Sequence, residues 1–297
     1  YTRGINDGER IIYYDGSKNW WSRNGSPETT PIGDPCGPDS EMFYDFGTEH
    51  DTSFGEFCHP NCDCGRFMEI GNNVFMAYRK VADGVFEELA QKYIDHGSGL
   101  ERIAAAAIDS PDVFKISLMW PIIEKLQALS GKDYDGHTES MRVIADHLRA
   151  ATFLAVDGCV PSNKEQGYVM RRLLRRAVRY SFDVGIEQNL LEEVVPVIAD
   201  MYTNDFPEVA QNRELIIAVL VKEEKAFRQT LRKGIAQMQK FAADGLTGSE
   251  LFMLYDTYGF PVELAVEEAQ KQGVEIPSDW RKQFESKMKE QRERSQT

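Results

Sequence analysis

The chain has 297 residues, a formal net charge of −14 and 42% hydrophobic residues, which is ordinary for a soluble folded protein. Its longest apolar run, residues 215–221, is far shorter than a membrane helix, so a transmembrane protein is excluded and no membrane partner is expected. The acidic balance opposes general nucleic-acid binding, because most of the surface repels phosphate; any such contact must be local. Five cysteines, an odd number, favour a reducing compartment, and we expect a cytoplasmic protein.

The first hundred residues are rich in glycine, proline, asparagine and aromatic side chains. The stretch RFMEIGNNVFMAYRKV, followed by a turn at ADG, is typical of antiparallel strands with long loops. From about Leu100 onward prolines and glycines become fewer and helical periodicity takes over. The sequence therefore predicts an α+β fold, in which an antiparallel sheet precedes an all-helical region.

Three cysteines are crowded in the first region, at Cys58, Cys62 and Cys64. They could bind zinc, although their spacing differs from the paired CxxC pattern of many structural zinc sites. Three further candidate ligands are within reach along the sequence: Cys36, His50 and His59. The other interpretation is a reduced loop whose cysteines happen to be neighbours, and metal analysis would decide between the two.

The segment YIDHGSGLERI combines the end of an expected strand, two glycines and a helix that opens near Leu100. Glycine lets the backbone approach a ligand closely, and a helix N-terminus favours anionic groups. Arg102, one turn into the helix, could reach a phosphate, and Asp95 could hold an ammonium group. The same pattern also fits a tight strand-to-helix turn with a solvent-facing arginine.

Five arginines gather in one predicted helix that begins near Gly167: Arg171, Arg172, Arg175, Arg176 and Arg179. On a helical wheel they lie opposite an apolar face that includes Met170, Leu174 and Ala177. Guanidinium groups suit bidentate phosphate contacts, and the block lacks glutamate partners four residues away, so the pattern favours a local phosphate-binding surface. The alternative is a solvated helix face balanced by acidic neighbours.

The C-terminal quarter carries clear helix boundaries. TGSE has the spacing of a capping box, and the helix that it opens should run to Gly259. A new helix is expected to start at Pro261 and to stop at Gly273. The last, highly charged segment fits an exposed connector helix.

Several of these segments resemble alanyl-tRNA synthetases, a family of the class II aminoacyl-tRNA synthetases. GSGLERI is similar to motif 3 of that class, and NWWSR, GPDSEMFYD and NNVFM resemble the catalytic domain upstream of it. Residues 142–179 and 254–264 are similar to signature segments of the tRNA-recognition region, in matching order and spacing. The resemblance covers nearly the whole chain. It implies the C-terminal part of a class II catalytic core over residues 1–110, a helical tRNA-recognition domain over 111–245, and its second part with a connector helix over 246–297.

The resemblance also implies an activity and a site. Alanine would be activated by ATP with Mg²⁺ and transferred to tRNA(Ala). Asp95 would hold the ammonium group of alanine, and the rest of the alanine site would be formed by Trp21, Asn72, Val74 and Gly97. Gly99 and Arg102 would bind ATP, with Arg102 as the catalytic cation at the phosphates. Gly71 departs from the family pattern, because many relatives have tryptophan there, and this puts the shape of the pocket in doubt.

For the tRNA partner, the resemblance implies that Asn163 and Asp256 read a G·U wobble pair in the acceptor stem. A wobble pair leaves the guanine 2-amino group without its usual partner in the minor groove, where a short acceptor can detect it. The five arginines would then hold the stem by its phosphates. Taken alone, Asn163 and Asp256 would be ordinary structural polar residues.

Two further motifs of the class are expected to precede Tyr1, and an editing domain is expected to follow Thr297. We therefore expect the chain alone to lack activation, because the arginine that grips the α-phosphate belongs to one of those motifs. An alternative is a stand-alone module that binds the acceptor stem without catalysis. A third hypothesis, an acidic helical scaffold with no role toward RNA, would bind G·U and G·C duplexes equally weakly.

Overall fold

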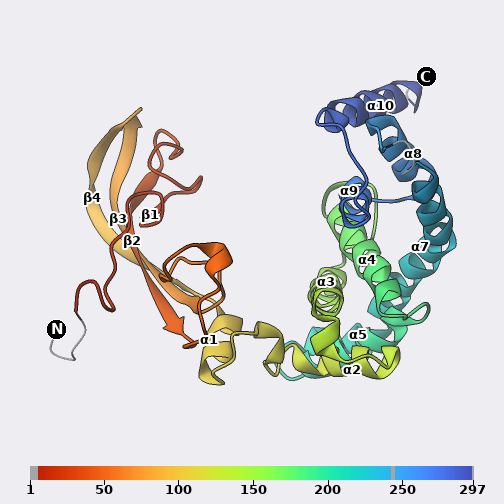
Figure 1. Ribbon diagram of the computed structural model, residues 1–297, viewed down its shortest axis with the longest axis horizontal. Helices are drawn as coiled ribbons and strands as arrows, with labels where there is room; N and C mark the ends of the chain where they lie inside the picture. The colour runs from red at the N-terminus through yellow and green to blue at the C-terminus, as the bar shows by residue number, and fades with distance from the viewer. Residues whose placement is uncertain (1–5, 242–244, 296–297) are drawn as a thin grey trace. The chain divides into compact units, whose positions relative to one another are not determined.

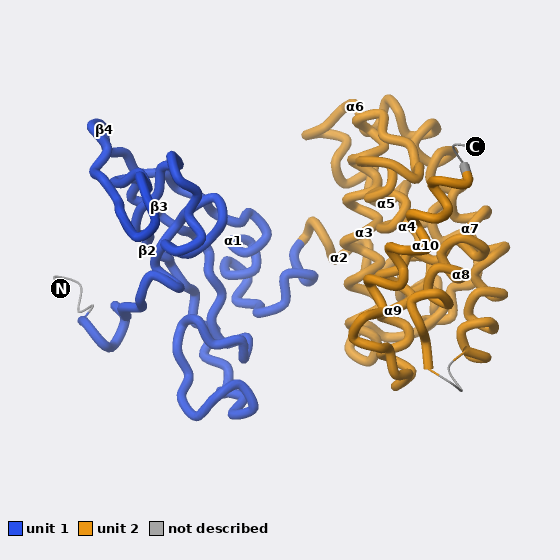
Figure 2. Tube along the Cα trace, turned by 90° about the horizontal axis from the view of Figure 1, so that it is seen from above, with its two compact units in different colours: residues 1–116 blue, residues 117–297 orange. Residues whose placement is uncertain are grey.

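The computed structural model describes residues 6–241 and 245–295. The chain divides into two compact units, residues 1–116 and 117–297, which Figure 2 shows in different colours. The division falls a few residues after the predicted boundary at 110. Residues 246–297, which were predicted as a separate part, belong to the second unit.

The first unit is built on one antiparallel sheet, whose strands lie in the order β1-β2-β3-β4 (Figure 1). Their bounds are Trp20–Trp21, Pro35–Asp45, Phe67–Ala82 and Val85–Ser98. β3 and β4 are joined at the predicted tight turn, where Gly84 has a φ of 71°. Such a positive φ suits glycine because a side chain would clash with the backbone.

Few side chains are fully buried in this sheet. Val74 and Met76 of β3 are buried, and Trp20 stacks on Tyr78 while meeting the ring of Phe86 edge-on. Much of the first unit is loop, including residues 46–66, which contain only the short 3-10 helix Thr52–Phe54. After the sheet, the helix α1 spans Leu100–Ala107, beginning where the sequence predicted, and the 3-10 turn Val113–Lys115 follows it.

The second unit is helical in its described part, as predicted. Its α-helices are α2 (Trp120–Ser130), α3 (Thr138–Val156), α4 (Glu165–Asp183), α5 (Leu190–Tyr202), α6 (Pro207–Gln211), α7 (Arg213–Phe241), α8 (Gly248–Tyr258), α9 (Val262–Lys271) and α10 (Trp280–Ser295), with a 3-10 turn at Tyr134–Gly136. The core lies where α3 and α4 face each other, with α5 and α7 packed around them. The sheet followed by helices confirms the predicted fold class.

Local sequence explains the helix ends around α8 and α9. Thr247 accepts from the backbone N–H of Glu250, whose side chain in turn bonds the backbone of Thr247, so the predicted capping box is present. α8 ends at Gly259, which has a φ of 67°, and Pro261 caps the start of α9. The predicted ends of α8 and the predicted start of α9 are confirmed, whereas α9 ends at Lys271, two residues before the predicted Gly273.

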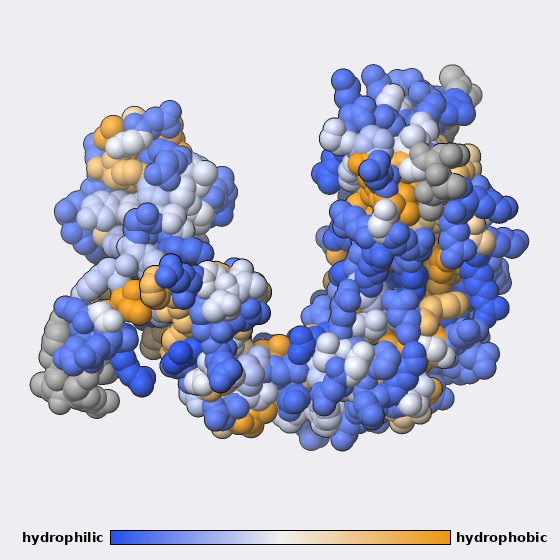
Figure 3. Space-filling model, viewed as in Figure 1, coloured by the Kyte–Doolittle hydropathy of each residue, from blue (hydrophilic) through white to orange (hydrophobic). Residues whose placement is uncertain are grey.

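On the face drawn in Figure 3, hydrophilic residues cover most of each unit, with apolar patches between them. None of the described helices is long and apolar enough to cross a membrane.

Candidate functional site

Four of the residues expected to bind alanine lie together on one face of the sheet. The register of β3 with β4 pairs Asn72 with Gly97 and Val74 with Asp95. Directly opposed residues project to the same side of a sheet, and so do residues two apart along a strand. The four positions therefore form one patch, in which Asp95 and Gly97 are exposed at the edge strand.

Trp21, the fifth expected residue, lies elsewhere in the sheet. It is on β1, where it pairs with Gly37 of β2 and is 39% exposed. β2 separates β1 from β3. The strand pairing therefore brings together four of the five expected residues and places Trp21 two strands away from Asn72.

Asp39, which was not predicted as a site residue, belongs to the same patch. It lies opposite Val74 on β2, and its carboxylate accepts a hydrogen bond from the side-chain amide of Asn72, with 3.1 Å between Nδ2 and Oδ2. The remaining side-chain oxygens of both residues, Oδ1 in each, are buried and have no hydrogen-bond partner. Two buried acceptors without donors are costly unless a ligand donates to them.

Surplus negative charge marks the neighbouring position on β2. Glu41 lies opposite Asn72, and burial, followed by the charges of Glu69 and Asp39, raises the pKa of its carboxyl group. The raised pKa reflects first the burial of the carboxyl group and then its closeness to two other acids. In the sequence, Asp39 and Glu41 are marked only by their place in GPDSEMFYD, a segment that resembles the family's catalytic domain.

A cavity of about 670 Å³ lies beside the two acids Asp39 and Glu41. Asp39 and Glu41 line it from β2, and Tyr14, His59 and Asn61 line it from the loops of the same unit. The arrangement offers carboxylate and amide oxygens to a ligand that carries amino groups or a cation.

Arg102 and Gly99, the expected ATP-binding residues, lie where β4 gives way to α1. Gly99 is the N-cap of the helix, and Arg102 lies in its first turn. The guanidinium of Arg102 donates to the side chain and the backbone carbonyl of Glu69, at 3.0 Å and 3.1 Å. Because half of the Arg102 side chain is exposed, its contact with Glu69 leaves part of the guanidinium open to a further partner.

Glycine at position 71 has a local explanation. A Cβ there would lie 2.8 Å from Cε of Met42 and 3.2 Å from Cε1 of His96. These neighbouring side chains, from β2 and β4, occupy the space that a larger side chain at position 71 would need.

The arginine helix α4 differs from the expected open cationic surface. The side chains of Arg175 and Arg179 are only 15% and 10% exposed, so these two guanidinium groups are largely enclosed by the protein. Arg175 pairs with Glu223 of α7, and Arg179 pairs with Asp183 and with Glu268 of α9. Burial lowers the pKa of Arg175, and the charge of Glu223 opposes this shift.

The other three arginines also have acidic partners. Arg171 pairs with Glu223 at 3.1 Å, Arg172 with Glu263 at 3.5 Å and Arg176 with Glu267 at 2.8 Å. These acids come from α7 and α9, far along the chain, so the sequence next to the arginines does not predict these pairs. The helix is therefore, in large part, an ion-paired surface between α4, α7 and α9. Arg172 has the most exposed of the five side chains, at 40%.

The two residues expected to read the base pair have partners within the chain. Asn163 lies in the loop before α4 and accepts a hydrogen bond from Arg171. Asp256 lies on α8 and accepts one from Gln291 of α10. Both contacts are between exposed side chains, so an RNA ligand could replace them.

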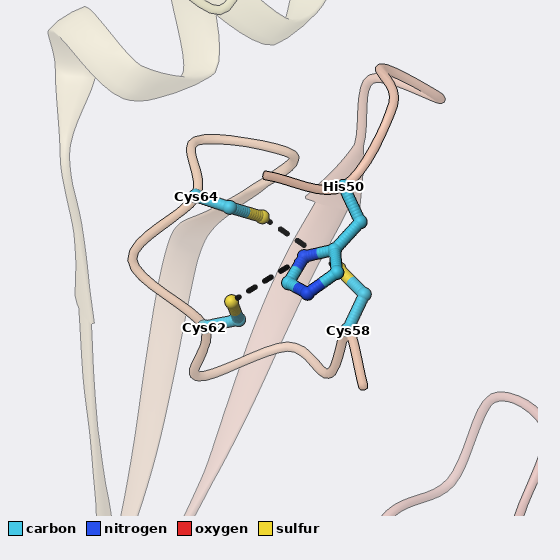
Figure 4. A group of neighbouring side chains, drawn as sticks. All are labelled: His50, Cys58, Cys62 and Cys64. Carbon is cyan, nitrogen blue, oxygen red and sulfur yellow. Dashed lines mark hydrogen bonds between the residues drawn. The ribbon is translucent and has the colours of Figure 1, made fainter. Parts of the chain in front are cut away.

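Three of the candidate zinc ligands, Cys58, Cys62 and Cys64, meet a fourth, His50 (Figure 4). The other two sequence candidates lie outside this group: Cys36 is buried against Tyr78, and His59 contacts Tyr14. Interaction with His50 lowers the pKa of the Cys64 thiol to about 6.

Comparison with known proteins agrees with the sheet and the helices described above. The profile of the family described as tRNA synthetases class II (A) matches residues 3–297. An "Alanine--tRNA ligase" of Halalkalibacterium halodurans is 40% identical over 97% of this chain and 33% of the relative. The enzymes of the same name from Shouchella clausii and Borrelia hermsii are each 38% identical, over 97% and 90% of this chain and 32% and 45% of their own lengths. The chain thus spans less than half of these relatives, and it belongs to the class II (A) tRNA synthetases.

Proposed function

We propose that this chain is the alanine-binding and acceptor-stem-binding part of an alanine–tRNA ligase that acts in the cytoplasm. The observation that carries the proposal is the patch on β2, β3 and β4, where residues assigned to alanine by resemblance lie beside buried oxygens that lack donors. The similarity to alanine–tRNA ligases over 97% of the chain supports the same assignment.

The chemistry of the patch suits the amino group of alanine. An ammonium group offers three donors, and Asp95 provides a full negative charge at its edge. Asn72 and Asp39 each have a free buried acceptor that an ammonium group could satisfy. The proposed pocket therefore selects for a cationic amine by charge and by hydrogen bonding.

The space beside Gly97 bears on which amino acid the site would accept. A Cβ placed on Gly97 would meet no atom within 4 Å, so packing within the chain does not require glycine there. In our proposal the open space belongs to the substrate, and the small exposed part of the Val74 side chain is its apolar neighbour.

For the nucleotide, we propose that Arg102 contacts the phosphates of ATP, with Gly99 allowing close approach of the backbone. Glu41 and Glu69 offer the oxygen ligands that Mg²⁺ prefers, and the ion, when bound, would neutralise phosphate charge. When ATP binds, Arg102 would leave Glu69 and pair with a phosphate, so its guanidinium would have an anionic partner both before and after binding.

For the RNA, we propose that Asn163 and Asp256 read the G·U pair of the tRNA(Ala) acceptor stem. In this proposal only some of the arginines of α4 contact phosphates. Arg172 and the half-exposed Arg176 remain as phosphate contacts, and Arg171 orients Asn163. Arg175 and Arg179 hold α4 to α7 and α9.

A binding measurement on the 297-residue chain tests the alanine site. A non-hydrolysable alanyl-adenylate analogue should bind to the chain, and Asp95→Asn and Asn72→Ala should abolish this binding. Lys92→Ala, a change on the same strand at an exposed lysine paired with Glu88, should leave it unchanged. Equal binding by all four proteins would contradict the proposal.

The alternative of an RNA-binding module without catalysis makes a different prediction. Such a module binds acceptor-stem duplexes but not the adenylate analogue. We further expect no alanine-dependent ATP–pyrophosphate exchange from the chain alone, because the resemblance assigns none of its residues to the α-phosphate. Exchange at the rate of a complete alanine–tRNA ligase would overturn this expectation.

A further inference from the structure

The side chains of His50, Cys58, Cys62 and Cys64 converge with the spacing of a tetrahedral metal site. Their ligand atoms all lie within 4.8 Å of one another. The sulfurs of Cys58 and Cys64 are 3.7 Å apart, and the sulfur of Cys62 is 3.9 Å from Nδ1 of His50. In a tetrahedron with zinc–sulfur bonds of about 2.3 Å, two sulfurs lie about 3.8 Å apart. We propose that these four residues bind one zinc ion in a Cys₃His site.

The hydrogen bonding of His50 prepares one of its nitrogens to bind a metal. Nε2 lies 2.8 Å from the backbone carbonyl oxygen of Gly55, an acceptor, so Nε2 must carry the proton. In the neutral ring Nδ1 is then left with a lone pair, and this is the atom that faces the sulfurs, as Figure 4 shows. A metal-bound histidine whose second nitrogen donates to a carbonyl is the usual arrangement at such sites.

The ligand types favour zinc over the hard cations. Thiolate and imidazole donors suit Zn²⁺, whereas Mg²⁺ and Ca²⁺ prefer oxygen ligands. A disulfide between Cys58 and Cys64 is the competing use of these residues. That disulfide would account for two of the four converging side chains and would leave Cys62 and His50 without a role.

The loop that carries the cluster has almost no apolar core of its own. Of residues 46–66, Cys62 alone is buried, and the large apolar side chains of Phe54 and Phe57 are 54% and 75% exposed. A long loop without an apolar core does not readily hold one conformation, and a structural metal ion supplies the missing free energy. The assignment therefore explains how a polar loop between β2 and β3 is ordered.

The position of the loop indicates what the metal would stabilise. Cys58, His59, Pro60 and Asn61 line the same cavity as Asp39 and Glu41. Zinc at the cluster would hold this part of the cavity lining in place. Zinc binding follows from the four ligands alone, so it can be true or false independently of the proposed function.

Zinc content measured by plasma mass spectrometry tests the site directly. The chain, purified under reducing conditions and reconstituted with Zn²⁺, should retain about one equivalent after gel filtration. His50→Ala and Cys62→Ser should each lose it, while two matched changes outside the cluster, His59→Ala and Cys159→Ser, should retain it. A wild-type content below about 0.2 equivalents would overturn the proposal.

A second measurement on the unaltered chain covers the case in which the cluster variants fail to fold. Co²⁺ added to the zinc-free protein should produce the intense visible absorption of tetrahedral cobalt thiolate, and Zn²⁺ should then displace it. Absence of that absorption would refute the ligand set. So would mass-spectrometric detection of a Cys58–Cys64 disulfide in a chain that, once reduced, takes up neither metal.

Discussion

Glu223 of α7 accepts two hydrogen-bonding contacts from the guanidinium of Arg175 on α4, with Oε1 2.8 Å from Nε and 2.6 Å from Nη2. The two side chains are only 9% and 15% exposed, so the contact is an almost buried ion pair between helices. The same carboxylate oxygen also lies 3.1 Å from Arg171. One acid thus compensates two cations in the core of the second unit.

Removal of Glu223 should therefore weaken the fold strongly. Glu223→Gln leaves two guanidinium groups without their counter-charge, and breaking a buried pair in this way costs about 3 kcal/mol. The control Glu187→Gln removes an exposed partner of Arg232, and such surface pairs contribute at most about 1 kcal/mol. Urea unfolding followed by circular dichroism measures both. Similar losses in the two variants would contradict the structural role of Glu223.

Arg172 is the better probe of phosphate binding, because Arg175→Ala would perturb stability as well. Arg172→Ala should weaken binding of acceptor-stem duplexes with G·U and G·C pairs alike and lower the slope of log affinity against log salt by about 1. Arg213, at the start of α7, is a matched control, since its side chain is 38% exposed and pairs with Asp200. Titrations at several salt concentrations provide the slopes. If Arg213→Ala changes them as much as Arg172→Ala, the surface around Arg172 is not a specific contact.

The arginine helix illustrates what a sequence can and cannot predict. Periodicity placed Met170 and Leu174 correctly on the buried face, because burial along a helix follows a local repeat. The partners of Arg175 and Arg176 are 48 and 91 residues away along the chain, and no local pattern encodes such pairs. From the sequence alone, the arginine side chains are therefore expected to be more exposed than they are in the structure.

In the candidate alanine site, too, local features were predictable and contacts between distant residues were not. The strands and the turn between β3 and β4 were predictable, because glycine and alternating side chains are local signals. The place of Asp39 in the site was not predictable, since it depends on a hydrogen bond to Asn72 on the neighbouring strand. The cysteines were visible in the sequence, but only the fold distinguishes His50 from His59 as their companion.

Asn163 and Asp256 should control selectivity more than affinity. Asn163→Ala or Asp256→Ala should erase the preference for a G·U over a G·C acceptor duplex, a loss of about 1–3 kcal/mol in discrimination. Gln291→Ala removes the side chain that now donates to Asp256, so this control should keep the preference. Competition binding with the two duplexes measures the ratio. A ratio that stays unchanged in both alanine variants would show that neither residue reads the pair.

Two glycines of the sheet should separate stability from ligand binding. A Cβ on Gly37 would lie 1.8 Å from the backbone oxygen of Phe75, so Gly37→Ala should lower the melting temperature by forcing β2 away from β3. A Cβ on Gly97 meets nothing within 4 Å, so Gly97→Ala should leave the melting temperature nearly unchanged while it weakens binding of the alanyl-adenylate analogue at least about tenfold. Thermal unfolding and calorimetric titration provide the two readouts. Unchanged analogue affinity in Gly97→Ala would mean that the open space beside Asp95 does not hold the substrate, whereas a loss of stability there would mean that the glycine serves the fold.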